Sequence, residues 1–251
     1  MLAIIGGSGL TQFAHLGVSR REVVRTPYGE PSGAITFGEL RGQSVAFLAR
    51  HGYGHTIPPH EINYRANLWA LRECGARGII AVASVGSIRP DLKPGDIVIP
   101  HQIIDYTWGR KSTFHEGNDC TVTHIDFTEP YDRDLRARLI AAAAAVGVDA
   151  SDSGVYAATQ GPRLESAAEI NRYERDGADL VGMTGMPEAA LARELDLPYA
   201  AINVVANLAA GRGDSSEGIS FEAIQAVLEV SMGQVRAIIE HMVAGEAARE
   251  A

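Results

Sequence analysis

The sequence has very little cysteine. Its 251 residues include two cysteines, Cys74 and Cys120, which are far apart and form no CxxC pair. A structural zinc site needs four ligands, and a disulfide framework needs more cysteines than this. The cysteine content therefore excludes both and indicates a cytoplasmic protein with reduced thiols.

Positive charge and long apolar runs are also scarce. Lys and Arg number 22 against 31 Asp and Glu, which gives a net charge of -9, and no basic cluster interrupts this balance. Nucleic-acid-binding proteins normally carry a basic face, so nucleic acids and anionic membranes are excluded as expected partners. No apolar run reaches the ~20 residues needed to span a bilayer. The apolar start, MLAII, has no Lys or Arg before it and indicates a first strand rather than a signal peptide.

The apolar residues that are present suffice for a large core, at 46% of the chain. Short β-branched segments alternate with helical patterns, which predicts an α/β fold with a mixed central sheet flanked by helices. We expect one domain over residues 1–245 and a frayed polar tail over 246–251. Strands are expected at residues 2–6, 34–40, 43–50, 78–85, 95–104, 153–160, 179–184 and 199–207, and helices at 58–75 and 133–147, near 165 and 187, and at 220–243.

Several residues at predicted strand ends are suited to binding an anion. The segment GGSG places Ser8 among glycines whose N–H groups can converge on an anion, although a simple tight turn explains it equally well. Arg50 and His51 end another strand, and arginine offers a two-pronged donor set for phosphate oxygens. Ser84 and Thr184 follow two further apolar strands and could add hydroxyls.

Other candidates have plain structural explanations. Glu165 lies near a predicted helix start, where a carboxylate favours the helix dipole. Met183 is of a type found more often in cores. Asp105, in an apolar run, is interpreted as a partner of Arg110. The run PYAAINVVANLAAG carries Asn207 at the predicted strand end, together with a deeper Asn203 that we expect to be a hydrogen-bonded structural amide.

Six motifs occur in a distinctive order: GGSGL, RHGYGH, NYRAN, QGPRLES, VGMT followed by PE, and the strand carrying Asn207. This set resembles the trimeric purine nucleoside phosphorylases and methylthioadenosine phosphorylases over residues 3–230. The resemblance implies a homotrimer with a nucleoside phosphorylase domain. It also implies a reaction in which inorganic phosphate, as co-substrate, displaces a purine from C1′ of a ribosyl unit, without a metal or an organic cofactor.

The resemblance also implies roles for individual residues. Met183 matches the residue under the ribose, and His124 falls near a position that reaches the 5′ pocket of a neighbouring subunit. The residues matched to phosphate ligands, or beside one, are Ser8, Arg50, His51, Ser84 and Thr184.

The expected base is a 6-oxopurine. Members that cleave adenine nucleosides carry aspartates at the positions of Asn207 and Ala209, whereas 6-oxopurine members carry Glu after GP and an Asn on the strand. Glu165 would accept a hydrogen bond from N1–H, and Asn207 would donate to N7 or O6. Adenine has no proton on N1, so Glu165 would face a lone pair. The catalytic set is therefore Asn207 and Glu165 with Arg50 and His51.

The expected sugar carries a 5′-methylthio group. Members acting on inosine place a histidine near the start of the last long helix, whereas the segment EGISFEAIQAVL has none. Ser220 and Phe221 are the expected contacts of the 5′ group in a less polar pocket. Together these features predict phosphorolysis of S-methyl-5′-thioinosine. The alternatives are an inosine and guanosine phosphorylase, in which the Ser220 hydroxyl meets a 5′-OH, and a methylthioadenosine phosphorylase. A hydrolytic nucleosidase and a non-catalytic nucleoside-binding protein are the rival classes.

Overall fold

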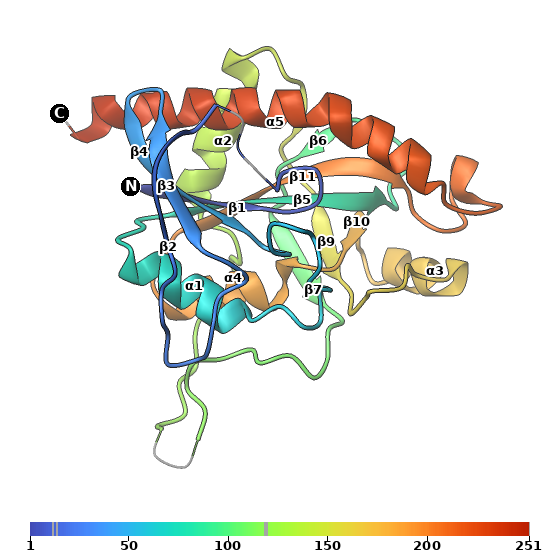
Figure 1. Ribbon diagram of the computed structural model, residues 1–251. Helices are drawn as coiled ribbons and strands as arrows, with labels where there is room; N and C mark the ends of the chain where they lie inside the picture. Colours follow the sequence, from blue (N-terminus) through green and yellow to red (C-terminus); the bar gives the residue numbers. More distant parts are fainter. Residues whose placement is uncertain (12, 14, 118–119, 251) are drawn as a thin grey trace.

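A mixed β-sheet forms the centre of the fold (Figure 1). The computed structural model describes residues 1–11, 13, 15–117 and 120–250, without the side chains of 246–250. The strands are β1 (Leu2–Gly6), β2 (Gly17–Glu22), β3 (Ile35–Leu40), β4 (Gln43–Ala49), β5 (Ile79–Ser87), β6 (Ile97–Val98), β7 (Gln102–Asp105), β8 (Ala150–Ser151), β9 (Val155–Ala158), β10 (Leu180–Gly182) and β11 (Tyr199–Leu208).

Helices cover both faces of this sheet (Figure 1). The longest, α5, packs with α2 against one face, and α1 and α4 pack together against the other. Strand β11 is apolar on both faces: Ile202 and Val204 join the core under α2 and α5, whereas Ala201 and Val205 join the opposite core. The helices are α1 (Tyr64–Glu73), α2 (Arg133–Ala145), α3 (Ala167–Arg175), α4 (Gly185–Glu194) and α5 (Phe221–Glu250), with a short 3₁₀ turn at Gly213–Ser215.

The central strand β5 brings two strand ends face to face. Along one edge, β5 pairs with β11 over its whole length. The other edge is shared: β1 pairs in parallel up to Ala81, and β10 pairs antiparallel at Gly86 and Ser87. Because β1 and β10 run toward each other, their carboxyl ends meet beside residues 82–85. Ligand sites in α/β folds gather at such points of reversal.

Three sequence predictions need correction. The expected strand 95–104 is two strands, since β6 pairs with β11 and β8, whereas β7 pairs with β9, beyond Pro100. The expected helix 58–75 begins only at Tyr64, because the Asn63 side chain accepts from the N–H of Ala66 and caps it there. Strand β2 was not predicted: all six of its residues are exposed, so it lacks the alternating apolar pattern of a half-buried strand.

Candidate active site

A cavity of about 990 Å³ occupies the place where β1 and β10 converge on β5. Its walls come from the ends of β1, β4, β5, β10 and β11, from the segment after β9, and from the first turns of α5. Ten of the twelve predicted site residues line this one cavity, namely Ser8, Arg50, His51, Ser84, Glu165, Met183, Thr184, Asn207, Ala209 and Phe221.

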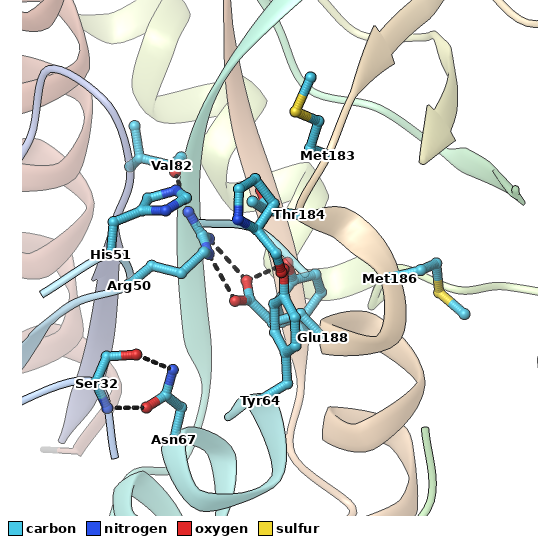
Figure 2. A network of polar contacts seen from close by, with 12 residues as sticks. Ser32, Arg50, His51, Tyr64, Asn67, Val82, Met183, Thr184, Met186 and Glu188 are labelled. Carbon is cyan, nitrogen blue, oxygen red and sulfur yellow. Dashed lines mark hydrogen bonds and ion pairs between the residues drawn. The ribbon is translucent and has the colours of Figure 1, made fainter. Parts of the chain in front are cut away.

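The cation of the cavity, Arg50, is held from behind by a buried carboxylate. The Arg50 side chain is 1% exposed and that of Glu188 0%. Nε and Nη2 of Arg50 donate to the two Glu188 oxygens at 2.7 Å each, and Nη1 donates to the Val82 carbonyl at 2.9 Å (Figure 2). A guanidinium has five N–H donors, so one on each Nη remains for a ligand. Burial alone lowers the pKa of Arg50, but the Glu188 charge outweighs it and the pKa is raised, so Arg50 stays cationic.

The glycine loop after β1 lies against this arginine. A Cβ on Gly7 would come within 2.6 Å of the Val82 carbonyl oxygen and 2.9 Å of the Arg50 Nη1 atom. Only a residue without a side chain permits this approach. The next residue, Ser8, places its hydroxyl 3.5 Å from His55 Nε2, and His55 also lines the cavity. The loop therefore lays its main chain at Gly7 against the Arg50 guanidinium and places the Ser8 hydroxyl in the lining of the same cavity.

His51 is a neutral imidazole with a defined tautomer. Its Nδ1 lies 2.8 Å from the Ile57 carbonyl oxygen and therefore carries the proton that it donates there. Burial, together with the neighbouring Arg50 charge, lowers the pKa of His51 to about 4. In the neutral ring Nε2 is an acceptor. As the phosphate ligand that the resemblance implies, His51 can donate to a phosphate oxygen only when its ring is protonated, whereas the neutral ring can accept from a phosphate hydroxyl.

This environment predicts an acid-sensitive stability. An unfolded histidine has a pKa near 6.5, so between that value and about 4 the unfolded chain binds more protons than the folded chain. Stability contributed by His51 is therefore present above pH 6.5 and is lost as pH falls, by about 2 kcal/mol at pH 5. His51→Gln keeps a donor for Ile57 but does not titrate. We expect the melting temperature to fall less between pH 7 and pH 5 for this variant than for wild type. Equal falls in melting temperature for the variant and wild type would contradict the lowered pKa of His51.

Met183 and Thr184 reach the cavity directly after β10. Thr184 is 7% exposed and precedes α4 without capping it through its side chain, while its N–H donates to the Tyr156 hydroxyl at 3.2 Å. A Cβ on Gly161 would lie 2.4 Å from the Met183 sulfur, and Gly161 has a φ of +60°. Glycine at this position is what allows the segment after β9 to close over Met183.

Glu165 lies outside any helix, before the Ser166 cap of α3. Its Oε1 accepts from the Thr159 hydroxyl at 2.6 Å, and Thr159 donates its main-chain N–H to the Gly182 carbonyl at 2.7 Å. Burial raises the pKa of Glu165, and the Thr159 bond partly opposes this. The carboxylate is thus fixed by one oxygen, at a position directly before the start of α3.

A β-bulge separates the two asparagines of β11. The pairing with β5 shifts between Val205 and Asn207, so that Asn207 opposes Gly86 and lines the cavity. Its Nδ2 donates to the Leu208 carbonyl at 2.6 Å. Asn203, before the bulge, is 0% exposed, and neither atom of its amide has a hydrogen-bond partner. The expectation of a hydrogen-bonded structural amide at Asn203 is therefore wrong.

The end of the cavity at α5 is mostly apolar, with Ile219, Phe221, Ile224 and Leu228 in its wall beside the polar Gln225. Two predicted contacts lie elsewhere. Ser220 is exposed and outside the lining. Its hydroxyl accepts from the Ala223 N–H at 3.2 Å and bonds the Glu222 carboxylate at 3.1 Å. His124 is also exposed and outside the lining.

Sequence reasoning missed two supporting residues. Glu188 was noted only as part of the PE motif, because nothing in the sequence marks it as the buried partner of Arg50. Arg110 was paired with Asp105, but Asp105 accepts from Thr107 at 2.7 and 2.8 Å, whereas Arg110 bonds carbonyl oxygens.

Within the described ranges, no group of three or more His, Cys, Asp or Glu is placed to hold a metal ion, and no helix is long and apolar enough to cross a membrane.

Known proteins share this architecture. The family model of the Phosphorylase superfamily matches residues 1–244. The chain belongs to the Phosphorylase superfamily. A probable S-methyl-5′-thioinosine phosphorylase of Pseudomonas syringae pv. tomato is 54% identical over 237 residues, covering 94% of this chain and 96% of that protein. A 6-oxopurine nucleoside phosphorylase of Pyrococcus furiosus is 52% identical over 215 residues, covering 84% and 80%.

A solved structure shares the phosphorylase fold. Methylthioadenosine phosphorylase from Schistosoma mansoni, in complex with adenine, superposes with a TM-score of 0.92 and is 33% identical, covering 98% of this chain and 92% of that one. The predicted family, the predicted α/β fold with a mixed sheet, and the predicted enzyme class, a pentosyltransferase of the nucleoside phosphorylase type, are confirmed.

Proposed function

We propose that this phosphorylase cleaves S-methyl-5′-thioinosine with inorganic phosphate, giving hypoxanthine and S-methyl-5-thioribose 1-phosphate. The observation that carries the proposal is the composition of one cavity. Glu165 and Asn207 lie in the same cavity as Arg50, while Ala209 stands where an adenine-reading aspartate would be expected. The relatives named above act, by their names, on S-methyl-5′-thioinosine and on 6-oxopurine nucleosides.

Phosphate is assigned to the end of the cavity at Arg50. The two guanidinium N–H groups not used by Glu188 and Val82 serve the anion, and the hydroxyls of Ser8, Ser84 and Thr184 complete the donor set. The reaction needs no enzyme nucleophile, because phosphate held in line with C1′ attacks it directly. Binding both reactants in this geometry makes the bimolecular step effectively unimolecular. One phosphate oxygen forms a bond to C1′ as the bond from C1′ to N9 breaks.

The base is assigned to Glu165 and Asn207. The electron pair of the breaking bond passes to the purine, so negative charge develops on the ring. The second N–H of the Asn207 amide, beyond the one held by Leu208, donates to N7 or O6 and strengthens as that charge grows. The Glu165 oxygen not held by Thr159 accepts from N1–H, which hypoxanthine has and adenine lacks.

The sugar assignment rests on the apolar end of the cavity. Ile219, Phe221, Ile224 and Leu228 present hydrocarbon to the 5′ position, which suits a methylthio group better than a hydroxyl. Gln225 lies in the same wall and is the residue that favours the second candidate, an inosine or guanosine phosphorylase.

The reaction class is tested by product analysis. With phosphate, we expect wild-type enzyme to convert S-methyl-5′-thioinosine to equal amounts of hypoxanthine and a sugar phosphate visible by ³¹P NMR. A hydrolytic nucleosidase would release hypoxanthine without phosphate, and a binding protein would bind the nucleoside without turnover. Either result would contradict the proposal.

Asn207→Asp separates the base contact from adenine recognition. The carboxylate has no N–H for N7 and repels the charge that develops on the base, so we expect kcat/KM for S-methyl-5′-thioinosine to fall by about 10²- to 10³-fold. The variant should not gain efficient cleavage of methylthioadenosine, since Glu165 still faces the lone pair on N1. Asn207→Ala is the control that removes the donor without adding charge. Efficient adenine-nucleoside cleavage by Asn207→Asp alone would contradict the two-residue account.

We also propose that the chain acts in the cytoplasm as a homotrimer, with phosphate as co-substrate and no cofactor. His124, exposed and outside the cavity lining, is then available to approach the cavity of a neighbouring subunit. Sedimentation should give three times the 26.7 kDa chain mass. A monomer that has full activity would contradict the assembly without affecting the proposed reaction.

A further inference from the structure

Arg110 joins the two loops that carry the base-reading and sugar-side residues. It lies outside the cavity lining, half-buried behind the ends of β9 and β10. These strands are parallel neighbours, with Gly182 opposite Ala158, so the segments that follow them leave the sheet side by side. The segment after β9 leads to Glu165, and the segment after β10 carries Met183 and Thr184.

The guanidinium of Arg110 bonds both segments at once. On the β10 side, Nη1 donates to the carbonyl oxygens of Met183 at 2.8 Å and Met186 at 2.6 Å, on either side of Thr184. On the β9 side, Nη2 donates to the carbonyl oxygens of Thr159 at 3.1 Å and Gln160 at 2.8 Å. One planar group thereby sets the spacing between the two segments.

The bonds continue toward the cavity from both sides. Thr159, whose carbonyl Arg110 holds, donates its hydroxyl to Glu165 at 2.6 Å. Nη1 also donates to the Tyr64 hydroxyl at 3.2 Å, and Tyr64 donates to the carbonyl of Pro59, a residue of the cavity wall, at 2.9 Å. Nε donates to the side-chain oxygen of Gln160 at 3.2 Å. Every partner named here is a main-chain carbonyl, an amide or a phenol oxygen, so Arg110 acts here as a multidentate donor.

We propose that Arg110 is a positioning residue that holds Glu165 in register with Met183 and Thr184. The purine, the sugar and the phosphate are then aligned for transfer of the sugar from the purine to phosphate. The proposal rests on the proposed function for the roles of those three residues. A misplacement of about 1 Å between reacting groups costs on the order of 10²-fold in rate. A residue that fixes two loops therefore affects catalysis without contacting substrate.

The chain offers a matched control in Arg136. Its guanidinium also bonds main-chain carbonyls, those of Pro100 at 2.7 Å, Ile99 at 3.3 Å and Asp152 at 2.5 Å, and it lies outside the cavity lining. Arg110→Met and Arg136→Met each remove a guanidinium that crosslinks main chain. Both variants should lower the melting temperature, whereas only Arg110→Met should change the kinetics measured well below that temperature.

The experiment compares kcat and KM for nucleoside and phosphate in wild type, Arg110→Met, Arg110→Lys and Arg136→Met, using the best nucleoside of the wild-type enzyme. We expect kcat/KM to fall about 10²-fold in Arg110→Met, less in Arg110→Lys, which retains some donors, and less than twofold in Arg136→Met. The loss in Arg110→Met combined with Glu165→Gln should be smaller than the product of the single losses, since both act on the same contact. If Arg110→Met does not fold, Arg110→Lys and its combination with Glu165→Gln give the same readout.

Two results would overturn the proposal. One is kinetics within twofold of wild type in the folded Arg110 variants, with only the melting temperature lowered as in Arg136→Met. The other is full multiplicativity with Glu165→Gln. Because the comparison uses whichever nucleoside wild type prefers, a preference for inosine would contradict the proposed function and leave the whole test of Arg110 intact. With an adenine nucleoside as the preferred substrate, the comparison of the single Arg110 variants with Arg136→Met carries the test.

Discussion

Arg50→Met should abolish most phosphorolysis and destabilise the protein at the same time. The variant removes the cation from the phosphate end of the cavity, and we expect kcat/KM to fall by at least about 10²- to 10³-fold. It also leaves the Glu188 carboxylate, 0% exposed, without its counter-ion. Breaking a buried pair by removing one partner costs about 3–5 kcal/mol, which for a chain of this size lowers the melting temperature by roughly 10 °C.

The two effects can be separated with a second substitution. In Arg50→Met with Glu188→Gln, neither charge of this pair remains. The amide oxygen at position 188 of the double variant can still accept the hydrogen bond that Tyr199 donates to Glu188 at 2.8 Å. We expect stability to return toward wild type while activity stays absent. Recovered activity in the double variant would show that Arg50 acts only through folding. Activity above a tenth of wild type in Arg50→Met would exclude Arg50 as the main phosphate ligand.

Glu165→Gln should lower the activity on the 6-oxopurine nucleoside and reduce the discrimination against adenine nucleosides. The Thr159 hydroxyl, now 2.6 Å from Oε1, would hold the amide oxygen of the variant in the same place. The amide NH₂ then faces the cavity, where it opposes N1–H of hypoxanthine but can donate to N1 of adenine. We expect kcat/KM for S-methyl-5′-thioinosine to fall by about 10²- to 10³-fold, with that for methylthioadenosine unchanged or raised.

Glu169→Gln provides the matched comparison. Glu169 lies in the first turn of α3, where it takes part in the capping box and pairs with Arg163 at 2.8 Å. It does not line the cavity. The same loss of charge there should leave the substrate ratio unchanged. A Glu165→Gln enzyme with its S-methyl-5′-thioinosine activity within tenfold of wild type would mean that N1–H is read by another group.

Sequence patterns predicted the elements that carry the site, because strand ends in α/β folds are marked by glycines and polar residues after apolar runs. They did not predict how β11 separates its two asparagines. Asn203 and Asn207 are four residues apart and would share a face of a regular strand. The bulge between Val205 and Asn207 changes that alternation and turns Asn207 to the cavity. A bulge depends on pairing with β5, which no local pattern encodes.

The supports of the site were equally hidden. Glu188 follows Arg50 by 138 positions, and the buried pair forms only when α4 packs against the sheet. Arg110 lies in a loop whose nearest acid in the sequence, Asp105, proved to bond Thr107 instead. Ser220 shows the limit of the opposite approach, because its predicted contact with the 5′ group is not found: the residue lies outside the described cavity lining, and its hydroxyl accepts from the Ala223 N–H at the start of α5.

The central claim is that one cavity reads a 6-oxopurine and an apolar 5′ group together. It is tested most directly by the kcat/KM of wild-type enzyme, at saturating phosphate, on S-methyl-5′-thioinosine, inosine and methylthioadenosine. The account predicts that S-methyl-5′-thioinosine is the best of the three, followed by inosine, with methylthioadenosine poorest by about 10⁴-fold. Methylthioadenosine cleaved as fast as S-methyl-5′-thioinosine would contradict the role of Glu165 and Asn207, and a preference for inosine would contradict the apolar 5′ assignment.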